Sequence, residues 1–222
     1  MNERKVLFVT CVNDEAMYAA CVSHISRLVV PDQYIVDLLP IRGASSMAAG
    51  YNLALRHEAK YKIYLHQDTF IVHPNFLEDV LSLFQAHPSL GMLGMIGCQV
   101  APPHGTWWNG TDLVGKVIWY VNQTYLLLTH GVISEPFAAV QSVDGLLLAT
   151  QYDIPWREDL FKGFHFYDAS QCREFLRHGF VVGVPRQNEP WCLHVSKDGY
   201  SLDTQAYDAY RQVYIAHYGG GS

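Results

Sequence analysis

Short apolar runs alternate with segments of helical periodicity through the first hundred residues. The apolar runs cover residues 5–10, 34–39, 61–66 and 92–100, and their composition predicts strands. Helical spacing of apolar residues follows at 14–28, from 43 to about 57, and after Pro74. Strands that alternate with single helices predict an α/β fold with a mostly parallel sheet flanked by helices on both faces.

The pattern changes after residue 100. Residues 101–140 are rich in loop-forming residues around a β-prone segment at 117–128, and residues 140–150 and 180–184 read as further strands. Helices are predicted at 168–177 and at about 203–217, and the last carries a tyrosine stripe that suits either packing on the domain or a homodimer contact. We expect one domain over residues 1–218, with functional halves at 1–100 and 101–218 and a flexible tail at 219–222.

Composition narrows the class of protein. Of 222 residues, 50% are hydrophobic and 16% are charged, which is enough apolar material for a sizeable core. A net charge of −6 without a Lys/Arg cluster argues against nucleic acid as a partner. The five cysteines lack CxxC spacing, and no apolar run approaches the ~20 residues of a transmembrane segment. We therefore expect a cytoplasmic protein with reduced thiols.

The most informative polar cluster ends the strand predicted at 61–66. His66, Gln67 and Asp68 follow this apolar run, and ligands of open α/β sheets bind beyond the carboxyl ends of the strands. Asp68 can hold a divalent cation that bridges phosphate oxygens, and His194, which closes another apolar stretch, is the candidate partner. The alternatives are a helix-capping or turn role for Asp68 and a structural role for His194.

Two further clusters follow the first and second predicted strands. Residues 10–14 contain Asn13 and Asp14, which suit either a ligand or the cap of the next helix. Residues 43–52 are rich in small side chains that let a ligand approach the start of a helix, or let that helix pack closely on the sheet. Neither GxxxxGK[ST] nor GxGxxG is present, so no standard phosphate loop is predicted.

Acidic and aromatic residues gather in the fourth cluster, residues 156–168. Aromatic faces stack on sugar rings, while carboxylates bind or deprotonate hydroxyl groups, so this segment suits a saccharide site. Asp168 stands at the predicted N-cap of the following helix, where backbone donors are expected to keep its pKa low. The alternative is that Asp168 serves only as that cap.

Together these clusters resemble glycosyltransferases of the GT-A fold, a Rossmann-like architecture with an acceptor-side C-terminal half. The chain is most similar to the family-2-like proteins named after a streptomycin-biosynthesis glycosyltransferase. The resemblance runs from about Lys5 to His194 and rests on four segments, residues 10–14, 47–52, 64–68 and 163–168. It implies transfer of a sugar from a nucleotide-diphosphate sugar to a hydroxyl of a glycan, glycoprotein or small-molecule acceptor.

The resemblance also implies roles for individual residues. The DxD metal motif corresponds to residues 66–68, with His66 in place of its first acid, so that Asp68 and His194 would hold Mn²⁺ or Mg²⁺. Asp144 and Gly145 resemble the segment under the donor sugar. The donor would further contact Thr10, Asn13, Asp14, Ser46, Gly50, Asn52, His66 and Gln67.

For catalysis, the resemblance points to Asp168. This residue precedes the Gly179-Phe180 pair by eleven positions, as the general base of inverting members does, and Tyr167 replaces the acid that usually precedes that base. The acceptor side would include Trp107, Trp108, Trp156, Glu158 and His165.

Three alternatives belong to other functional classes. A catalytically silent GT-A domain would bind a nucleotide or glycan without transferring sugar, in keeping with the two replaced acids. A nucleotidyltransferase typically needs a glycine-rich, basic loop after the first strand, whereas residues 11–15 are acidic and glycine-free. A metal-dependent hydrolase would suit the eleven histidines, but the chain has no HxH or HExxH pair.

Overall fold

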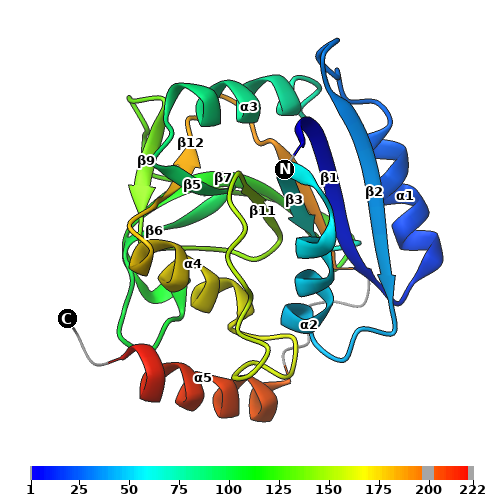
Figure 1. The fold of residues 1–222 in the computed structure, drawn as a ribbon. Helices are drawn as coiled ribbons and strands as arrows, with labels where there is room; N and C mark the ends of the chain where they lie inside the picture. Colours follow the sequence, from blue (N-terminus) through cyan, green and yellow to red (C-terminus); the bar gives the residue numbers. More distant parts are fainter. Residues whose placement is uncertain (1, 197–202, 220–222) are drawn as a thin grey trace.

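A seven-stranded sheet forms the centre of the molecule in the computed structural model, which describes residues 2–196 and 203–219. Its strand order is β2-β1-β3-β11-β5-β12-β9, with helices on both sides (Figure 1). The bounds are β1 (Asn2–Val12), β2 (Ile35–Arg42), β3 (Ala59–Leu65), β5 (Leu90–Gly94), β9 (Phe137–Val140), β11 (Leu147–Thr150) and β12 (Val181–Pro185). The predicted α/β class, a large sheet flanked by helices, is confirmed.

Neighbouring strands of this sheet are parallel where a helix connects them in the chain, as between β1, β2 and β3. β1 pairs in parallel with both β2 and β3, and β5 pairs in parallel with β12. β11 is antiparallel to β3 and β5, and β9 is antiparallel to β12, so the complete sheet is mixed. The carboxyl ends of β1 and β3 consequently meet at one edge, while β11 runs toward them from the other direction.

The helices divide between the two faces of the sheet. Buried residues of α1 (Glu15–Ile25) and α3 (Phe76–Ala86) form one core with Val6 and Phe8 of β1. Those of α2 (Met47–Asn52) and α4 (Tyr167–Arg177) form a second core with Leu7 and Val9. Alternating residues of β1 thus face opposite sides, as expected for a strand covered on both faces. A short 3₁₀ helix, η1 (Leu53–Arg56), continues α2.

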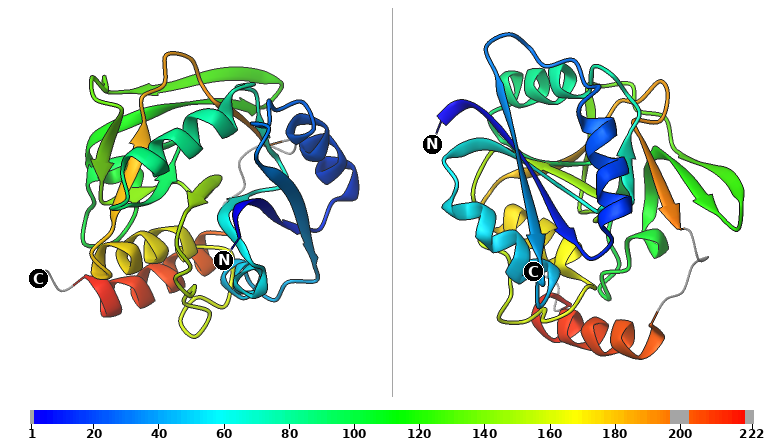
Figure 2. Two further views of the ribbon diagram at one scale, coloured as in Figure 1. Left: turned by 45° about the horizontal axis from the view of Figure 1, so that its top comes forward. Right: turned by 90° about the vertical axis from the view of Figure 1, so that its right-hand side faces the viewer.

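A second sheet packs beside the first and is built largely from strands that follow residue 95. Its order is β10-β6-β7-β13-β4, and β8 pairs with the opposite edge of β7 in a hairpin that projects from the body (Figure 2). The remaining bounds are β4 (Thr69–Ile71), β6 (Ile96–Val100), η2 (Trp107–Asn109), β7 (Thr111–Val121), β8 (Thr124–His130), β10 (Ser142–Val143) and β13 (Cys192–Ser196).

Two predicted strands prove to be pairs of strands. The run at 92–100 is divided at Met95 into β5 and β6, and the run at 140–150 is divided at Asp144-Gly145 into β10 and β11. In both cases the two halves belong to different sheets. The prediction of single strands was wrong because apolar residues are buried on both sides of each bend, so the hydrophobic pattern does not mark it.

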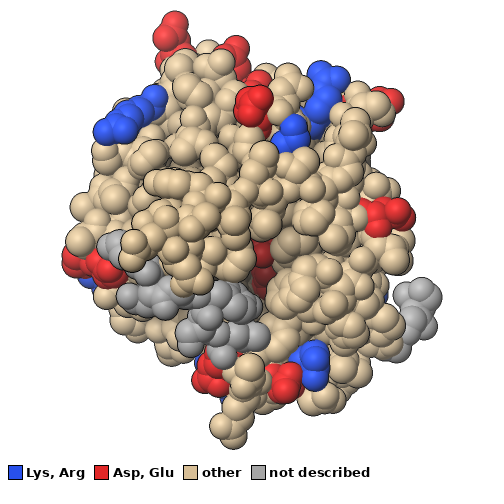
Figure 3. All heavy atoms as spheres, turned by 180° about the vertical axis from the view of Figure 1, so that it is seen from behind, with Lys and Arg blue, Asp and Glu red and all other residues tan. Residues whose placement is uncertain are grey.

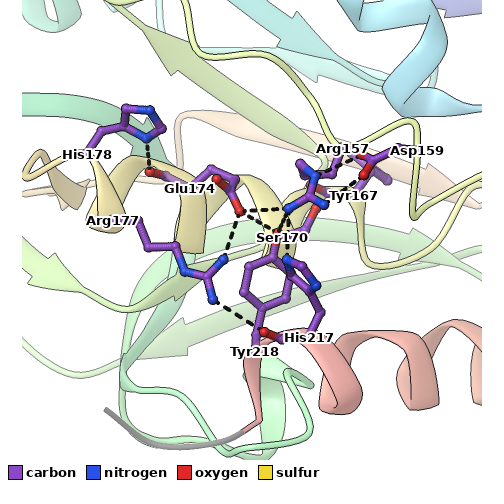
Figure 4. Close-up of polar contacts among 9 residues, drawn as sticks. All are labelled: Arg157, Asp159, Tyr167, Ser170, Glu174, Arg177, His178, His217 and Tyr218. Carbon is purple, nitrogen blue, oxygen red and sulfur yellow. Dashed lines mark hydrogen bonds and ion pairs between the residues drawn. The ribbon is translucent and has the colours of Figure 1, made fainter.

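The last helix, α5 (Thr204–Tyr218), lies along α4, and polar contacts tie the two together (Figures 1 and 4). Arg157 pairs with Glu174 of α4 at 3.4 Å, and Tyr218 donates a 2.6 Å hydrogen bond to the same carboxylate. The Tyr214 and Tyr218 side chains are buried against Phe161 and Phe166. Of the two interpretations of the tyrosine stripe, the structure therefore shows packing on the protein itself.

None of the helices within residues 2–196 and 203–219 is long and apolar enough to cross a membrane. Residues 220–222 of the expected flexible tail lie outside the described residues.

Candidate functional site

A pocket of about 320 Å³ opens at the edge where β1 and β3 end. Polar atoms of the loop after β3 form one side, and small or apolar residues between β2 and α2 form the other. The lining residues are Cys11, Val12, Asn13, Ile41, Gly43, Ala44, Met47, His66, Gln67, Asp68 and Phe164. This position beyond the carboxyl ends of parallel strands is the one expected for a ligand of an α/β sheet.

Charge is sparse over much of the face shown in Figure 3. Most basic and acidic side chains lie toward its periphery, and acidic atoms are visible at the bottom of a hollow near its centre. A concave, weakly charged surface with a few buried polar groups is typical of small-ligand sites.

Gln67 joins the ends of the two parallel strands. Its Oε1 accepts hydrogen bonds from the backbone N–H groups of Asn13 and Asp14, each at 3.0 Å. Its side-chain amide donates to Asn13 Oδ1. The loop after β1 is thereby held against the loop after β3, which brings the predicted residues Asn13, His66, Gln67 and Asp68 to one pocket.

His66, Asp68 and His194 form a cluster whose ligand atoms all lie within 4.8 Å of one another. The distance from Asp68 Oδ1 is 3.5 Å to His194 Nε2 and 3.9 Å to His66 Nδ1. His194 arrives through the antiparallel pairing of β13 with β4, in which it stands opposite Thr69. Asp68 Oδ1 is buried and has no hydrogen-bond partner among residues 2–196 and 203–219, so one carboxylate oxygen and two imidazoles are available to a divalent cation.

The charges of this cluster favour an ionised carboxylate. Burial opposes ionisation of Asp68, but the adjacent His194 and His66 rings outweigh it and hold the pKa of Asp68 below its usual range. Burial lowers the pKa of His66 more than the Asp68 carboxylate raises it. Burial also opposes protonation of His194, but its pairing with Asp68 gives a raised pKa overall. At neutral pH the cluster thus offers an anionic oxygen beside a neutral His66 ring.

Asp168 behaves differently from the prediction. Phe166, with φ of 60°, is the N-cap of α4, and Asp168 lies inside the first turn. Burial and the nearby Asp144 carboxylate raise the pKa of Asp168 to about 7, although backbone N–H groups of Ala169 and Gly145 oppose this shift. The expected capping role and low pKa are therefore wrong, because desolvation and like charge outweigh the helix terminus.

Asp144 is held next to Asp168 by two donors. Trp107 Nε1 donates to Asp144 Oδ2, and the Leu146 N–H donates to Oδ1, both at 2.9 Å. A Cβ atom at Gly145 would lie 2.2 Å from the Tyr167 hydroxyl and 3.0 Å from Asp168 Cβ. The absence of a side chain at Gly145 therefore lets the β10–β11 turn approach the start of α4 closely.

Other predicted donor residues lie behind the pocket and are not among its lining residues. Asp14 caps α1 by accepting from the Met17 N–H at 2.9 Å, and Ser46 caps α2 by accepting from the Ala49 N–H at 3.1 Å. A Cβ at Gly50 would lie 2.6 Å from Cys11 Sγ, so Gly50 allows close packing of α2 on β1. Thr10 is buried within β1. These residues thus stabilise β1, α1 and α2, of which β1 and α2 contribute residues that line the pocket.

Asn52 and Trp156 hydrogen-bond each other and do not line the pocket. The Asn52 amide donates to the Trp156 carbonyl at 3.0 Å and accepts from the Trp156 N–H at 2.8 Å. The Trp156 ring is buried against Tyr51 and Tyr64, each with a centroid separation of 4.9 Å. Both side chains are thus held within the protein, and neither is among the residues that line the pocket.

The remaining acceptor-side candidates fall into two groups. Trp108 is 45% exposed, and its ring centroid lies 5.9 Å from that of Tyr207, which is 5.5 Å from the His165 ring. Trp107 is buried and holds Asp144, whereas Glu158 is exposed on the loop before α4. Trp108 and His165 thus share one aromatic surface around α5.

Sequence reasoning missed several contacts of the site. Phe164 is 56% exposed at the pocket, and the neighbouring Gly163 carbonyl accepts from the Met47 N–H at 3.1 Å. Tyr167 bonds His66 across the site. Both contacts join segments far apart in the chain, so local periodicity carries no signal for them.

The structure is thus that of an α/β protein with a pocket at the strand ends and a His/Asp cluster, part of which lines that pocket. A family model described as "Glycosyltransferase like family" matches residues 7–218. The chain belongs to this glycosyltransferase-like family. No curated protein matches the chain.

Solved structures support the same fold. A mannosyltransferase, PcManGT from Pyrobaculum calidifontis, in complex with GDP-Man and Mn²⁺, superposes with a TM-score of 0.55 at 15% identity, over 90% of this chain and 59% of that chain. TarS 1-349 from S. aureus, in complex with UDP, gives a TM-score of 0.54 at 8% identity, over 98% and 72% respectively. The chain thus spans 59% of the length of the mannosyltransferase.

Proposed function

We propose that the protein transfers a sugar from a nucleotide-diphosphate sugar to an acceptor hydroxyl, with inversion and with Asp168 as general base. The observation that carries the proposal is the His66–Asp68–His194 cluster, of which His66 and Asp68 line the strand-end pocket, in a member of a glycosyltransferase-like family. The superposed mannosyltransferase holds GDP-Man and Mn²⁺, and the superposed TarS fragment holds UDP.

The strand-end pocket is the proposed donor site. Asn13, fixed by Gln67, would contact the nucleotide, and Asp14, Ser46, Gly50 and Thr10 would support the pocket from behind. His66, Asp68 and His194 have the oxygen and nitrogen atoms to hold Mn²⁺ or Mg²⁺. Such a cation, when bound, would neutralise charge that develops on the departing nucleoside diphosphate.

Asp168 is the proposed base. Its pKa of about 7 suits a group that must accept a proton near neutral pH, and its neighbours Asp144 and Gly145 would lie under the donor sugar. Trp108 and His165 would form the acceptor side together with exposed Glu158. In this arrangement Asp168 removes the proton of the acceptor hydroxyl as that oxygen attacks the anomeric carbon.

The chain would group with the streptomycin-named family-2-like proteins and act in the cytoplasm on a glycan, glycoprotein or small molecule. Residues 1–100 would bind the donor and residues 101–218 the acceptor, within one domain. The transferred group would be a hexose. A homodimer is compatible with the proposal but does not enter the mechanism.

The first test is ligand-dependent melting of the full chain with a panel of nucleoside diphosphates and their sugars, with and without Mn²⁺. A ligand that binds only the folded state stabilises it by about 2.7 kcal/mol at one hundred times its Kd, so one base should raise Tm, and more strongly with Mn²⁺. Asp68→Asn should abolish the Mn²⁺-dependent part of this rise.

Asp79→Asn is the matched control for this variant. Asp79 also pairs with a histidine, His73 Nε2 at 2.6 Å, but neither residue lines the strand-end pocket. The Mn²⁺-dependent rise should persist in Asp79→Asn. No rise with any nucleotide would contradict the proposal. A rise without transfer or donor hydrolysis would instead identify a silent nucleotide-binding domain.

A further inference from the structure

Two positions at which the chain departs from the family pattern touch each other. His66 replaces the first acid of the metal motif, and Tyr167 replaces the acid before the base. In the structure, His66 Nε2 and the Tyr167 hydroxyl form a hydrogen bond, although one residue follows β3 and the other begins α4. Tyr167 is 3% exposed, so this bond is largely shielded from water.

The Tyr167 hydroxyl has a second partner that decides the direction of this bond. The hydroxyl donates to the Gly145 carbonyl at 3.1 Å, and a carbonyl oxygen can only accept. Since a phenol carries one proton, its oxygen is left as an acceptor toward His66. His66 must then donate from Nε2–H, and a neutral imidazole with Nε2–H has a lone pair on Nδ1.

The other side of the His66 ring agrees with this tautomer. Nδ1 lies 3.9 Å from Asp68 Oδ1, which is too far for a hydrogen bond, and no atom in the described part of the chain hydrogen-bonds Oδ1. In the opposite tautomer, the Nδ1–H group would be too far from Asp68 Oδ1 to donate to it. The Tyr167 hydroxyl would then have to donate to His66 Nε2 and could no longer donate to the Gly145 carbonyl. Two lone pairs that face each other across such a gap are suited to a shared cation.

We propose that Tyr167 is a positioning residue that relays the His66 Nε2–H bond to the Gly145 carbonyl and thereby fixes Nδ1 of His66 as a cation ligand. The inference rests on the proposed function only in assigning that cation to donor binding. It also couples the two departures from the family pattern: the imidazole needs an acceptor behind it, and the phenol supplies one that is itself anchored to the β10–β11 turn.

The direct test is the tautomer of His66 in the wild-type protein without metal. Long-range ¹H–¹⁵N spectra distinguish Nε2–H from Nδ1–H imidazole, and the signals are assigned by their loss in His66→Asn. At about pH 8, above the usual imidazole pKa near 6.5, the neutral ring should show Nε2–H. A predominant Nδ1–H tautomer would overturn the inference, and this measurement requires no altered protein beyond the assignment variant.

The second test is the affinity for Mn²⁺ alone, measured by electron paramagnetic resonance with Tyr167→Phe. Removing the partner behind a metal-binding imidazole typically weakens metal binding about 10- to 100-fold, and the tautomer preference should disappear as well. Tyr51→Phe is the matched control. The Tyr51 ring lies 5.9 Å from that of Tyr167 in the same buried cluster, but its hydroxyl has no hydrogen-bond partner among the residues that the structure describes.

The outcomes separate this inference from the proposed function. Equal weakening of Mn²⁺ binding in both variants, unchanged binding in Tyr167→Phe, or a wild-type protein that binds no Mn²⁺ would each overturn the positioning role. Nucleotide binding and sugar transfer that persist in those cases would leave the proposed function standing. Conversely, the expected tautomer and Mn²⁺ effects in a protein that binds no nucleotide would support the positioning role and contradict the donor site.

Discussion

Asp68 and Asp168 are both half-buried carboxylates at the same edge of the molecule, and their surroundings move their pKa values in opposite directions. Desolvation is the largest influence on each. Beside Asp68, the His194 and His66 rings outweigh the effect of desolvation and lower the pKa. Beside Asp168, the Asp144 carboxylate adds to the effect of desolvation, and the pKa rises to about 7. The neighbours therefore decide the charge state.

This difference suits two chemically identical side chains to different tasks. A carboxylate that stays ionised can hold a cation, while one with a pKa close to neutrality can accept and release a proton at working pH. The two pKa values differ because different parts of the fold surround the two carboxylates. Strand β13 brings His194 to Asp68, and the β10–β11 turn brings Asp144 to Asp168. The variants below change Asp168 itself or its neighbour Asp144.

The largest effect is expected from Asp168→Asn. An amide cannot accept the proton of the acceptor, so kcat should fall about 10²- to 10⁴-fold, whereas the Kd for the donor nucleotide should stay within a factor of two to three of wild type. Sugar transfer and equilibrium nucleotide binding measure the two quantities separately. Asp159→Asn, on an exposed acid paired with Arg157, is the control and should retain transfer. Near-normal turnover in Asp168→Asn would refute the assignment of the base.

A smaller effect is expected from Asp144→Asn, which removes the like charge but leaves the burial of Asp168. The base must be deprotonated to act, so kcat/KM in the wild type should rise with pH through about 7. In Asp144→Asn the midpoint of this rise should move to lower pH, whatever happens to the maximal rate. An unchanged midpoint would show that Asp144 does not influence the base, and Asp159→Asn should leave the midpoint in place.

The smallest effect concerns stability. Because the folded state binds the Asp168 proton more tightly than the unfolded state, protonation stabilises the fold at low pH. This stabilisation is lost as the pH rises from the ordinary carboxyl pKa of 3.8 through about 7. Asp168→Asn should therefore raise Tm by a few °C near pH 8 and by less near pH 5. Thermal melts at both pH values measure this, and an equal change at the two pH values would contradict the raised pKa.

Much of the first half could be predicted from sequence because its elements are local. The helix predicted after Pro74 is α3, with Phe76, Leu77 and Val80 buried as their spacing indicates, and the run at 61–66 is β3. The start of α4 could not be predicted in detail. Phe166 adopts a left-handed conformation that its sequence gives no reason to expect, and this moves Asp168 from the cap into the first turn.

The α/β class, the strand before His66-Gln67-Asp68 and the choice of His194 as a candidate ligand could be predicted because hydrophobic periodicity and residue chemistry are local properties. Three contacts become evident only in the folded chain: Trp156 hydrogen-bonds Asn52, Asp144 stands beside Asp168, and Tyr167 bonds His66. These contacts join distant segments, and a pKa or a tautomer depends on the groups that surround a side chain in space rather than on its neighbours in the chain.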